Sequence, residues 1–156
     1  MNEATKEALR LLSGLLTPLI AVVAAYIAYQ QYRTNELKLR LDLYQVRFKV
    51  FRALMDFIGS VVSERNISAA VVRQFDAETN ESSFLFGKDI SEYLALVRGK
   101  AEEITTINAQ IEPLMQYERN EERTRLTRDK VKLIEWFYAQ LPISKAKFAE
   151  YLAIAD

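Results

Sequence analysis

The chain has 156 residues and no formal net charge, because 21 Lys and Arg side chains balance 21 Asp and Glu side chains. It contains no Cys, which excludes disulfides and thiolate metal sites, and no His, which removes the commonest general base and the commonest metal ligand. The length suits one domain with an anchor, and only four Gly and three Pro favour long helices over Gly-rich phosphate loops.

An uncharged, largely apolar stretch comes first and runs from Leu11 to Tyr32. As a helix, its 22 residues would be roughly 33 Å long, which matches the ~30 Å of hydrocarbon in a bilayer. Its downstream end carries a tyrosine cluster, where aromatic rings favour the membrane interface: Tyr26, Tyr29 and Tyr32. We therefore predict a transmembrane helix over 11–32, preceded by a short N-terminal tail over 1–10.

Two other interpretations of this stretch are a cleaved signal peptide and a buried helix of a soluble domain. The segment from Ala21 to Ala28 contains no Ala-x-Ala cleavage site, which argues against the signal peptide. Uncharged stretches of this length are uncommon in soluble domains, which argues against the buried helix.

The basic residues around the stretch predict its orientation, because cytoplasmic flanks carry an excess of Lys and Arg. Lys6 and Arg10 lie upstream. Six basic residues lie within 20 residues downstream: Arg33, Lys38, Arg40, Arg47, Lys49 and Arg52. This asymmetry predicts an N-terminus outside and a cytoplasmic C-terminal domain. The three residues nearest the surface, Arg33, Lys38 and Arg40, are candidates for contact with anionic lipid head groups. Nucleic-acid binding is not expected, because acidic residues interleave with the basic ones.

A seam of small residues lies within the stretch, at alternating spacings of three and four: Gly14, Thr17, Ala21, Ala24 and Ala28. Small side chains on one face let transmembrane helices approach closely. The seam is therefore a candidate helix–helix interface and favours a homo-oligomer or a membrane-protein partner. The alternative is a seam that faces lipid.

Residues 33–156 show helical periodicity and are predicted to form a cytoplasmic antiparallel bundle of three to four helices. The expected fold is all-α, with the transmembrane helix continuing into this bundle. Two neighbouring apolar rows over 37–61 form a wide stripe, which predicts a near-continuous helix to about Val62.

Three further helices complete the predicted bundle. Asn66 is expected to cap the second helix, and the polar stretch 76–83 is expected to be a loop. The third helix is expected to start at Asp89 and stop before Pro113. Mixed charges over 117–132 indicate the solvated face of a fourth helix, which is expected to end at Pro142 and to be followed by a short closing helix.

Several segments resemble those of a known group. They are Tyr29-Gln30-Gln31-Tyr32-Arg33-Thr34-Asn35, then Leu37-Lys38-Leu39-Arg40-Leu41-Asp42-Leu43-Tyr44 with Arg47-Phe48, and further on Phe84-Leu85-Phe86-Gly87 and Gln140-Leu141-Pro142. The chain resembles a broad group of small, uncharacterised bacterial membrane proteins with one N-terminal span and a helical cytoplasmic tail. The resemblance implies a bacterial inner-membrane location and transfers no catalytic residue.

No catalytic site is expected. The usual nucleophile triads need His, and carboxylate-bridged metal sites in helical bundles use Glu-x-x-His, which this chain lacks. The sequence therefore predicts a protein that is not an enzyme, with no cofactor, no metal ion and no evident small-molecule substrate.

The expected function is a membrane-anchored helical scaffold that assembles with itself or with another membrane or cytoplasmic protein, with the lipid bilayer as its other partner. The alternative is a small oligomeric pore or membrane-perturbing effector, for example in bacterial phage defence. The span contains no charged residue and few polar ones, which favours the scaffold.

Overall fold

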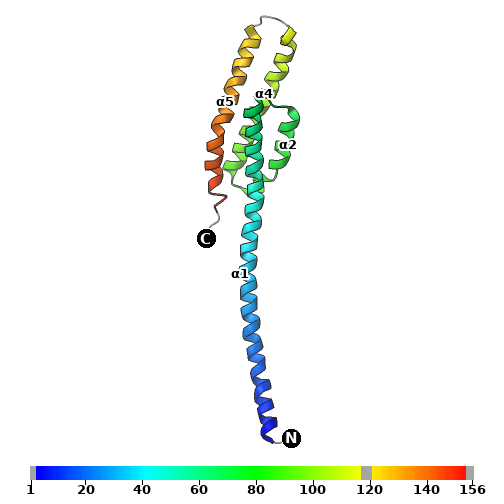
Figure 1. Ribbon diagram of the computed structural model, residues 1–156, viewed down its shortest axis with the longest axis vertical. Helices are drawn as coiled ribbons and strands as arrows, with labels where there is room; N and C mark the ends of the chain where they lie inside the picture. Colours follow the sequence, from blue (N-terminus) through cyan, green and yellow to red (C-terminus); the bar gives the residue numbers. More distant parts are fainter. Residues whose placement is uncertain (1–2, 117–120, 154–156) are drawn as a thin grey trace. The chain divides into compact units, whose positions relative to one another are not determined.

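Helices account for every regular element of the structure, a computed structural model that describes residues 3–116 and 121–153 and, within them, side chains from Pro18 onwards. The elements are α1 (Glu3–Glu64), α2 (Ala69–Thr79), α3 (Ser82–Leu85), α4 (Lys88–Ile111), the 3-10 helix η1 (Glu112–Gln116) and α5 (Glu121–Ala149) (Figure 1). No strand occurs in the described ranges. The prediction of an all-α protein is confirmed.

The chain divides into two units, Met1–Asp42 and Leu43–Asp156. In the first unit, every side chain from Pro18 to Asp42 is exposed. Helix α1 itself ends at Glu64, so the prediction of one near-continuous helix to about Val62 is confirmed.

The predicted span falls only partly on residues with described side chains. Among those residues, no helix is both long enough and apolar enough to cross a membrane. Residues 11–17 of the span lie outside them, as do Gly14 and Thr17 of the predicted seam.

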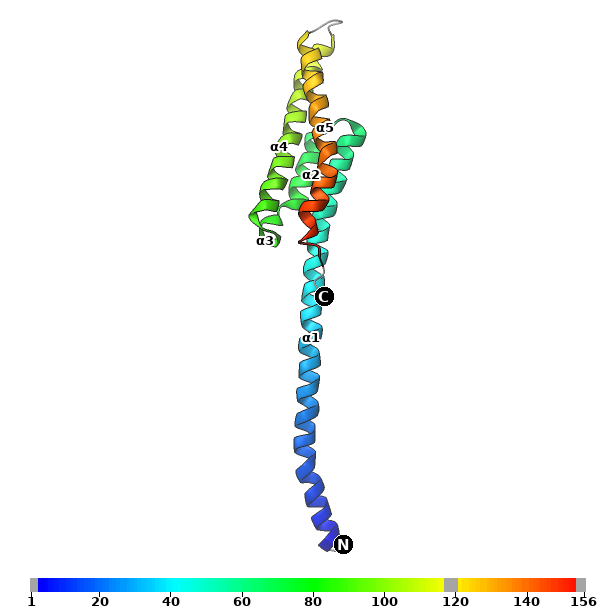
Figure 2. The ribbon, with the colours of Figure 1, turned by 90° about the vertical axis from the view of Figure 1, so that its left-hand side faces the viewer.

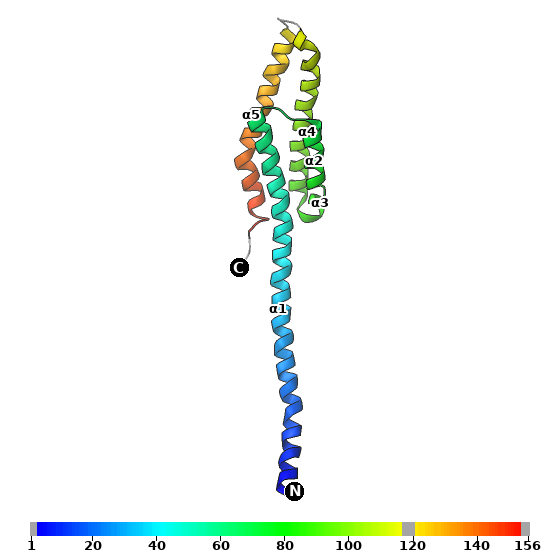
Figure 3. The ribbon, with the colours of Figure 1, turned by 45° about the vertical axis from the view of Figure 1, so that its right-hand side comes forward.

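The second unit is a helical bundle in which successive helices run in alternating directions. The part of α1 from Leu43 onwards, α2, α4 and α5 point alternately up and down in Figures 1 and 3. Helix α4 contacts α2, α3 and α5, and it runs beside α5 in the perpendicular view as well (Figure 2). This position makes α4 the helix that joins α2, α3 and α5.

The core fills the space between these helices. On α1, the apolar stripe is buried at Val50, Leu54, Phe57, Ile58 and Val61. The other helices complete the core with Val72, Phe75, Ile90, Leu94, Val97, Ala101, Ile104, Phe137 and Phe148. Aromatic rings connect three helices at its centre, because Phe57 stacks on Phe75 at 4.1 Å between ring centroids and meets Phe137 edge-on at 6.2 Å. Aromatic pairs in this range add about 0.5–1.5 kcal/mol beyond the area that they bury.

The start and end of the second helix differ from the prediction. Ser68, not Asn66, is the N-cap of α2, and its side chain accepts a hydrogen bond from the Val71 amide. Asn66 Oδ1 instead accepts hydrogen bonds from Asn108 Nδ2 at 2.7 Å and Lys130 Nζ at 3.2 Å. Cross-helix bonding of Asn66 therefore replaces the expected cap.

The polar stretch 76–83 is not the loop that its composition suggested. Helix α2 continues through it to Thr79, and α3 begins at Ser82. Thr79 is buried and donates its hydroxyl to the Phe75 carbonyl at 2.8 Å, so its polar group is satisfied within the helix. Burial of one face of α2 against α4 outweighs the loop-like composition of the other face.

Pro142 does not end the fourth helix, because α5 runs through it to Ala149. A proline inside a helix lacks its N–H donor and costs about 3 kcal/mol or more. Ser144 and Phe148, which follow the proline, are completely buried. Their packing keeps the last two turns helical, and the separate closing helix that was expected is the end of α5.

Candidate functional site

The described part of the predicted seam lies on an uncovered face of α1. Ala21, Ala24 and Ala28 are exposed, and at 100° per residue they fall within an arc of about 60°. Large apolar side chains occupy the opposite half of the helix, including Leu19, Val22 and Tyr26, which are 62%, 67% and 62% exposed. Between Pro18 and Ala28, α1 therefore offers one small-residue face and one bulky apolar face.

The predicted lipid-contact residues are also exposed. Arg33, Lys38 and Arg40 all lie on the uncovered part of α1. Arg40 Nη2 forms an ion pair with Glu36 Oε1 at 2.9 Å, one helical turn away. Because exposed pairs of this kind contribute about 0–1 kcal/mol, Arg40 stays available to a stronger anionic partner.

Arg47, one of the six predicted orientation residues, has a structural role in the bundle. Its Nε donates to the Leu85 carbonyl at 2.9 Å, and its Nη1 donates to the Tyr151 carbonyl at 3.4 Å. Its guanidinium also lies 5.8 Å from the ring centroid of Phe86 and 5.5 Å from that of Tyr151. Arg47 thereby ties α1 to the end of α3 and to the chain segment after α5.

Tyr151 closes the same end of the bundle. Its hydroxyl donates to Asp89 Oδ1 at 2.8 Å and accepts from the Gly87 amide at 3.3 Å. The hydrogen bond to Asp89 raises the pKa of the Tyr151 hydroxyl above its ordinary value. Helix α4 begins at Lys88, and its N-cap is Gly87, so the predicted cap at Asp89 is wrong. The Asp89 carboxylate instead accepts the hydrogen bond from Tyr151.

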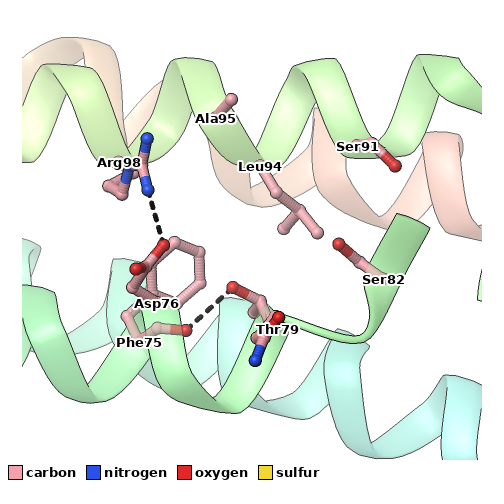
Figure 4. A pocket seen from close by; sticks show the side chains of 9 residues that line it. Phe75, Asp76, Thr79, Ser82, Ser91, Leu94, Ala95 and Arg98 are labelled. Atoms are coloured by element: carbon pink, nitrogen blue, oxygen red, sulfur yellow. Dashed lines mark hydrogen bonds and ion pairs between the residues drawn. The ribbon is translucent and has the colours of Figure 1, made fainter. Parts of the chain in front are cut away.

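A polar pocket of 340 Å³ opens between α2, α3 and α4 (Figure 4). Its apolar wall is made by Phe75, Leu94 and Ala95. Its polar lining is Asp76, Thr79, Asn80, Ser82, Ser91 and Arg98. The volume is at the small end of the ~300–1,000 Å³ typical of ligand sites.

An ion pair occupies one end of the pocket. Arg98 Nη1 donates to Asp76 Oδ1 at 2.7 Å, and Glu102 Oε1 lies 3.7 Å from Arg98 Nε. This Nε is buried without a hydrogen-bond partner. The hydrogen bond to Asp76 and the charge of that carboxylate raise the pKa of Arg98 further above its ordinary value, so the guanidinium is permanently charged.

Hydroxyl groups occupy the other end. Ser82 is 7% exposed, its Oγ forms no hydrogen bond within the described residues, and Figure 4 shows this oxygen pointing toward Leu94 across the pocket. Ser91 Oγ donates to the Gly87 carbonyl at 3.4 Å. The pocket thus combines opposite charges, hydroxyls and a short apolar wall.

Sequence reasoning missed this pocket. Asp76 lay in a predicted loop, and Arg98 follows it by 22 positions on another helix, so no local motif links the two. The signal that was available is the polar clustering around Ser82 in an otherwise apolar bundle.

No group of three or more acidic side chains capable of holding a metal ion occurs in the described ranges. The chain as a whole was compared with protein-family models, curated proteins and solved structures, and none of them matches it.

Proposed function

We propose that the chain is a membrane-anchored helical module that assembles with itself or with another membrane or cytoplasmic protein and catalyses no reaction. The observation that carries the proposal is the uncovered apolar surface of α1, where Leu19, Ile20 and Val22 are each more than 60% exposed. Exposed apolar surface of this extent is unfavourable in water and is typical of surfaces that contact a membrane or another protein.

The distribution of large apolar side chains supports lipid as the main contact. Their arc includes Leu19, Ile20, Val22, Val23 and Ile27, which are 49–67% exposed. Burying each of them in hydrocarbon contributes about 1.5–3 kcal/mol. Five such side chains would hold the helix firmly in a bilayer.

Charge and aromatic residues support an orientation with the N-terminus outside. Tyr26, Tyr29 and Tyr32 are 62%, 60% and 69% exposed and suit an interfacial belt. The basic residues that follow, Arg33, Lys38 and Arg40, suit anionic head groups on the cytoplasmic side. The resemblance of this segment to small bacterial proteins with one span favours the inner membrane of a bacterium.

Membrane extraction tests the anchor. The full chain, produced in bacteria, is expected to remain in the membrane pellet after alkaline carbonate washing. The variant Val22→Lys/Val23→Lys is expected to appear in the supernatant, because each buried charge costs about 2.5–3.5 kcal/mol at the centre of a span. Release of the unaltered chain by carbonate would refute the anchor.

Reporter fusions at the C-terminus test the orientation. A fluorescent protein fused there is expected to be bright and a periplasmic phosphatase fused there to be inactive. The reverse pattern would place the bundle outside and overturn the charge argument.

Self-association is tested on the seam. Ala21→Leu/Ala24→Leu places two leucines on the small-residue face, whereas the control Val22→Leu/Val23→Leu places two leucines mainly elsewhere. If the seam is an interface, the first variant loses association in a membrane two-hybrid assay and the second keeps it. Equal association in both variants would remove the seam from the proposal.

A further inference from the structure

The pocket between α2, α3 and α4 contains a hydroxyl group that the described part of the protein leaves without a hydrogen bond. Ser82 is 7% exposed, and its hydroxyl has no partner in the described part of the chain. The neighbouring Thr79 hydroxyl, by contrast, is satisfied by the Phe75 carbonyl. A serine hydroxyl can both donate and accept, so Ser82 Oγ can hydrogen-bond a molecule inside the pocket.

The charges at the other end restrict what that partner can be. Arg98 contributes one positive charge, whereas Asp76 and Glu102 contribute two negative charges within ion-pair distance of it. A simple anion would be repelled by both carboxylates, and a simple cation would be repelled by the guanidinium. A molecule with one charge of each sign avoids both repulsions.

The hydrogen-bonding capacity of the ion pair fits such a molecule. The guanidinium has five N–H donors, and Asp76 takes one of them through Oδ1. Asp76 Oδ2 makes no hydrogen bond to the described residues. The side chains of Arg98 and Asp76 are 42% and 56% exposed, so a ligand reaches them without entering the core.

We propose that this pocket binds a small zwitterion, namely a free α-amino acid with a short polar side chain. Its carboxylate would bind Arg98 and its ammonium would bind Asp76. Its side chain would run along Leu94 and place its polar group against the Ser82 hydroxyl (Figure 4). The pocket volume of 340 Å³ suits a ligand of this size. The proposal is independent of the membrane anchor.

Ligand-observed NMR on the full chain in lipid nanodiscs tests the proposal, with empty nanodiscs as the blank. The probes are glycine, L-serine and L-glutamine, and the comparison compounds are acetate, methylammonium and glycerol. We expect L-serine or L-glutamine to bind at least about tenfold more tightly than any comparison compound, because two charge-assisted contacts act together. Absence of binding by all three amino acids, or equal binding by a comparison compound, would overturn the proposal.

Two matched pairs of variants locate the binding. Ser82→Ala is expected to weaken L-serine and L-glutamine about 2- to 10-fold and to leave glycine unchanged, since glycine has no side chain. Ser83→Ala, the exposed neighbour, is expected to change nothing. Arg98→Gln is expected to weaken all three ligands at least about tenfold, whereas Arg73→Gln, on the exposed face of α2, is expected to have no effect.

Helix content and thermal unfolding of each variant check that the bundle is intact. If Arg98→Gln fails to fold, Ser82→Ala alone tests whether the ligand binds in the pocket. This change removes only one oxygen atom and should leave the fold intact. Equal weakening of glycine and L-serine by Ser82→Ala would contradict the assigned orientation, and binding unaffected by either pocket variant would exclude the pocket.

Discussion

Tyr93 carries the central hydroxyl of a buried polar network between α4 and α5. This hydroxyl donates to Gln140 Oε1 at 3.0 Å and lies 2.9 Å from Ser144 Oγ. Because an amide oxygen only accepts, the tyrosine proton goes to Gln140, and Ser144 is the donor in the second contact. Gln140 and Ser144 are 5% and 0% exposed, so bulk water does not reach the network.

Tyr93→Phe removes the donor of Gln140 and the acceptor of Ser144 at once. Ser144 can turn its hydroxyl to the backbone carbonyl one turn earlier, as serines in helices do. Gln140 Oε1 has no second donor in the described part of the chain and is left unsatisfied. We therefore expect a loss of about 1–3 kcal/mol in the free energy of unfolding. For a domain near 100 residues this lowers Tm by roughly 4–8 °C for each kcal/mol.

Denaturant unfolding of the full chain in nanodiscs measures this loss. Trp136, the only tryptophan of the chain, packs edge-on against the core ring Phe137 at 5.1 Å and reports the bundle by its fluorescence. Ser144→Ala alone is expected to cost about 1 kcal/mol. The double variant is expected to cost less than the sum, because both changes break one shared bond. A Tyr93→Phe protein within about 0.5 kcal/mol of the unaltered chain would refute the reasoning.

Three further predictions concern the same bundle and use the same unfolding assay. Phe137→Ala leaves a cavity at a completely buried site and should lower the free energy of unfolding by about 3–5 kcal/mol. A decrease of less than about 1 kcal/mol would contradict the position of Phe137 in the core. Gly87→Ala should destabilise, because a Cβ there would lie 2.6 Å from both Asp89 Oδ1 and the Tyr151 hydroxyl and would disturb the hydrogen bond between them. Gly99→Ala meets nothing within 4 Å and should stabilise α4 by about 0.5–1 kcal/mol. Burial raises the pKa of Tyr93 above 10.0, so its stabilisation is complete below pH 10.0 and is lost as the pH rises through the folded-state pKa. Tyr93→Phe should therefore flatten the alkaline loss of stability, and an unchanged pH profile would contradict the assignment.

The helical periodicity of the sequence predicted most of the fold. In α4, the apolar residues that recur every three or four positions are all buried: Ile90, Leu94, Val97, Ala101 and Ile104. Residues at this spacing lie on one face of a helix, which here packs on the core. The limits of helices were less predictable. Pro142 and the stretch 76–83 both looked like breaks, and in both places the packing of buried side chains outweighed the local preference.

The residues of the candidate site were much harder to predict from the sequence than the fold. Arg47 looked like one more basic residue beside the membrane, and only the folded chain brings Leu85, Phe86 and Tyr151 to it. Asp76 and Arg98 likewise meet across two helices. Contacts between residues distant in the chain depend on helix packing, which periodicity alone does not specify.

The depth of a single spin label measures the proposed anchor most directly. Because the chain has no Cys, Val22→Cys and Gln45→Cys each provide one labelling site. Both positions are exposed, so a label is tolerated at either one. If residues 11–32 span the bilayer, the label at position 22 in lipid vesicles relaxes strongly with oxygen and weakly with a water-soluble nickel chelate. The label at position 45 shows the reverse. Strong relaxation by the nickel chelate at both positions would contradict a membrane-spanning helix.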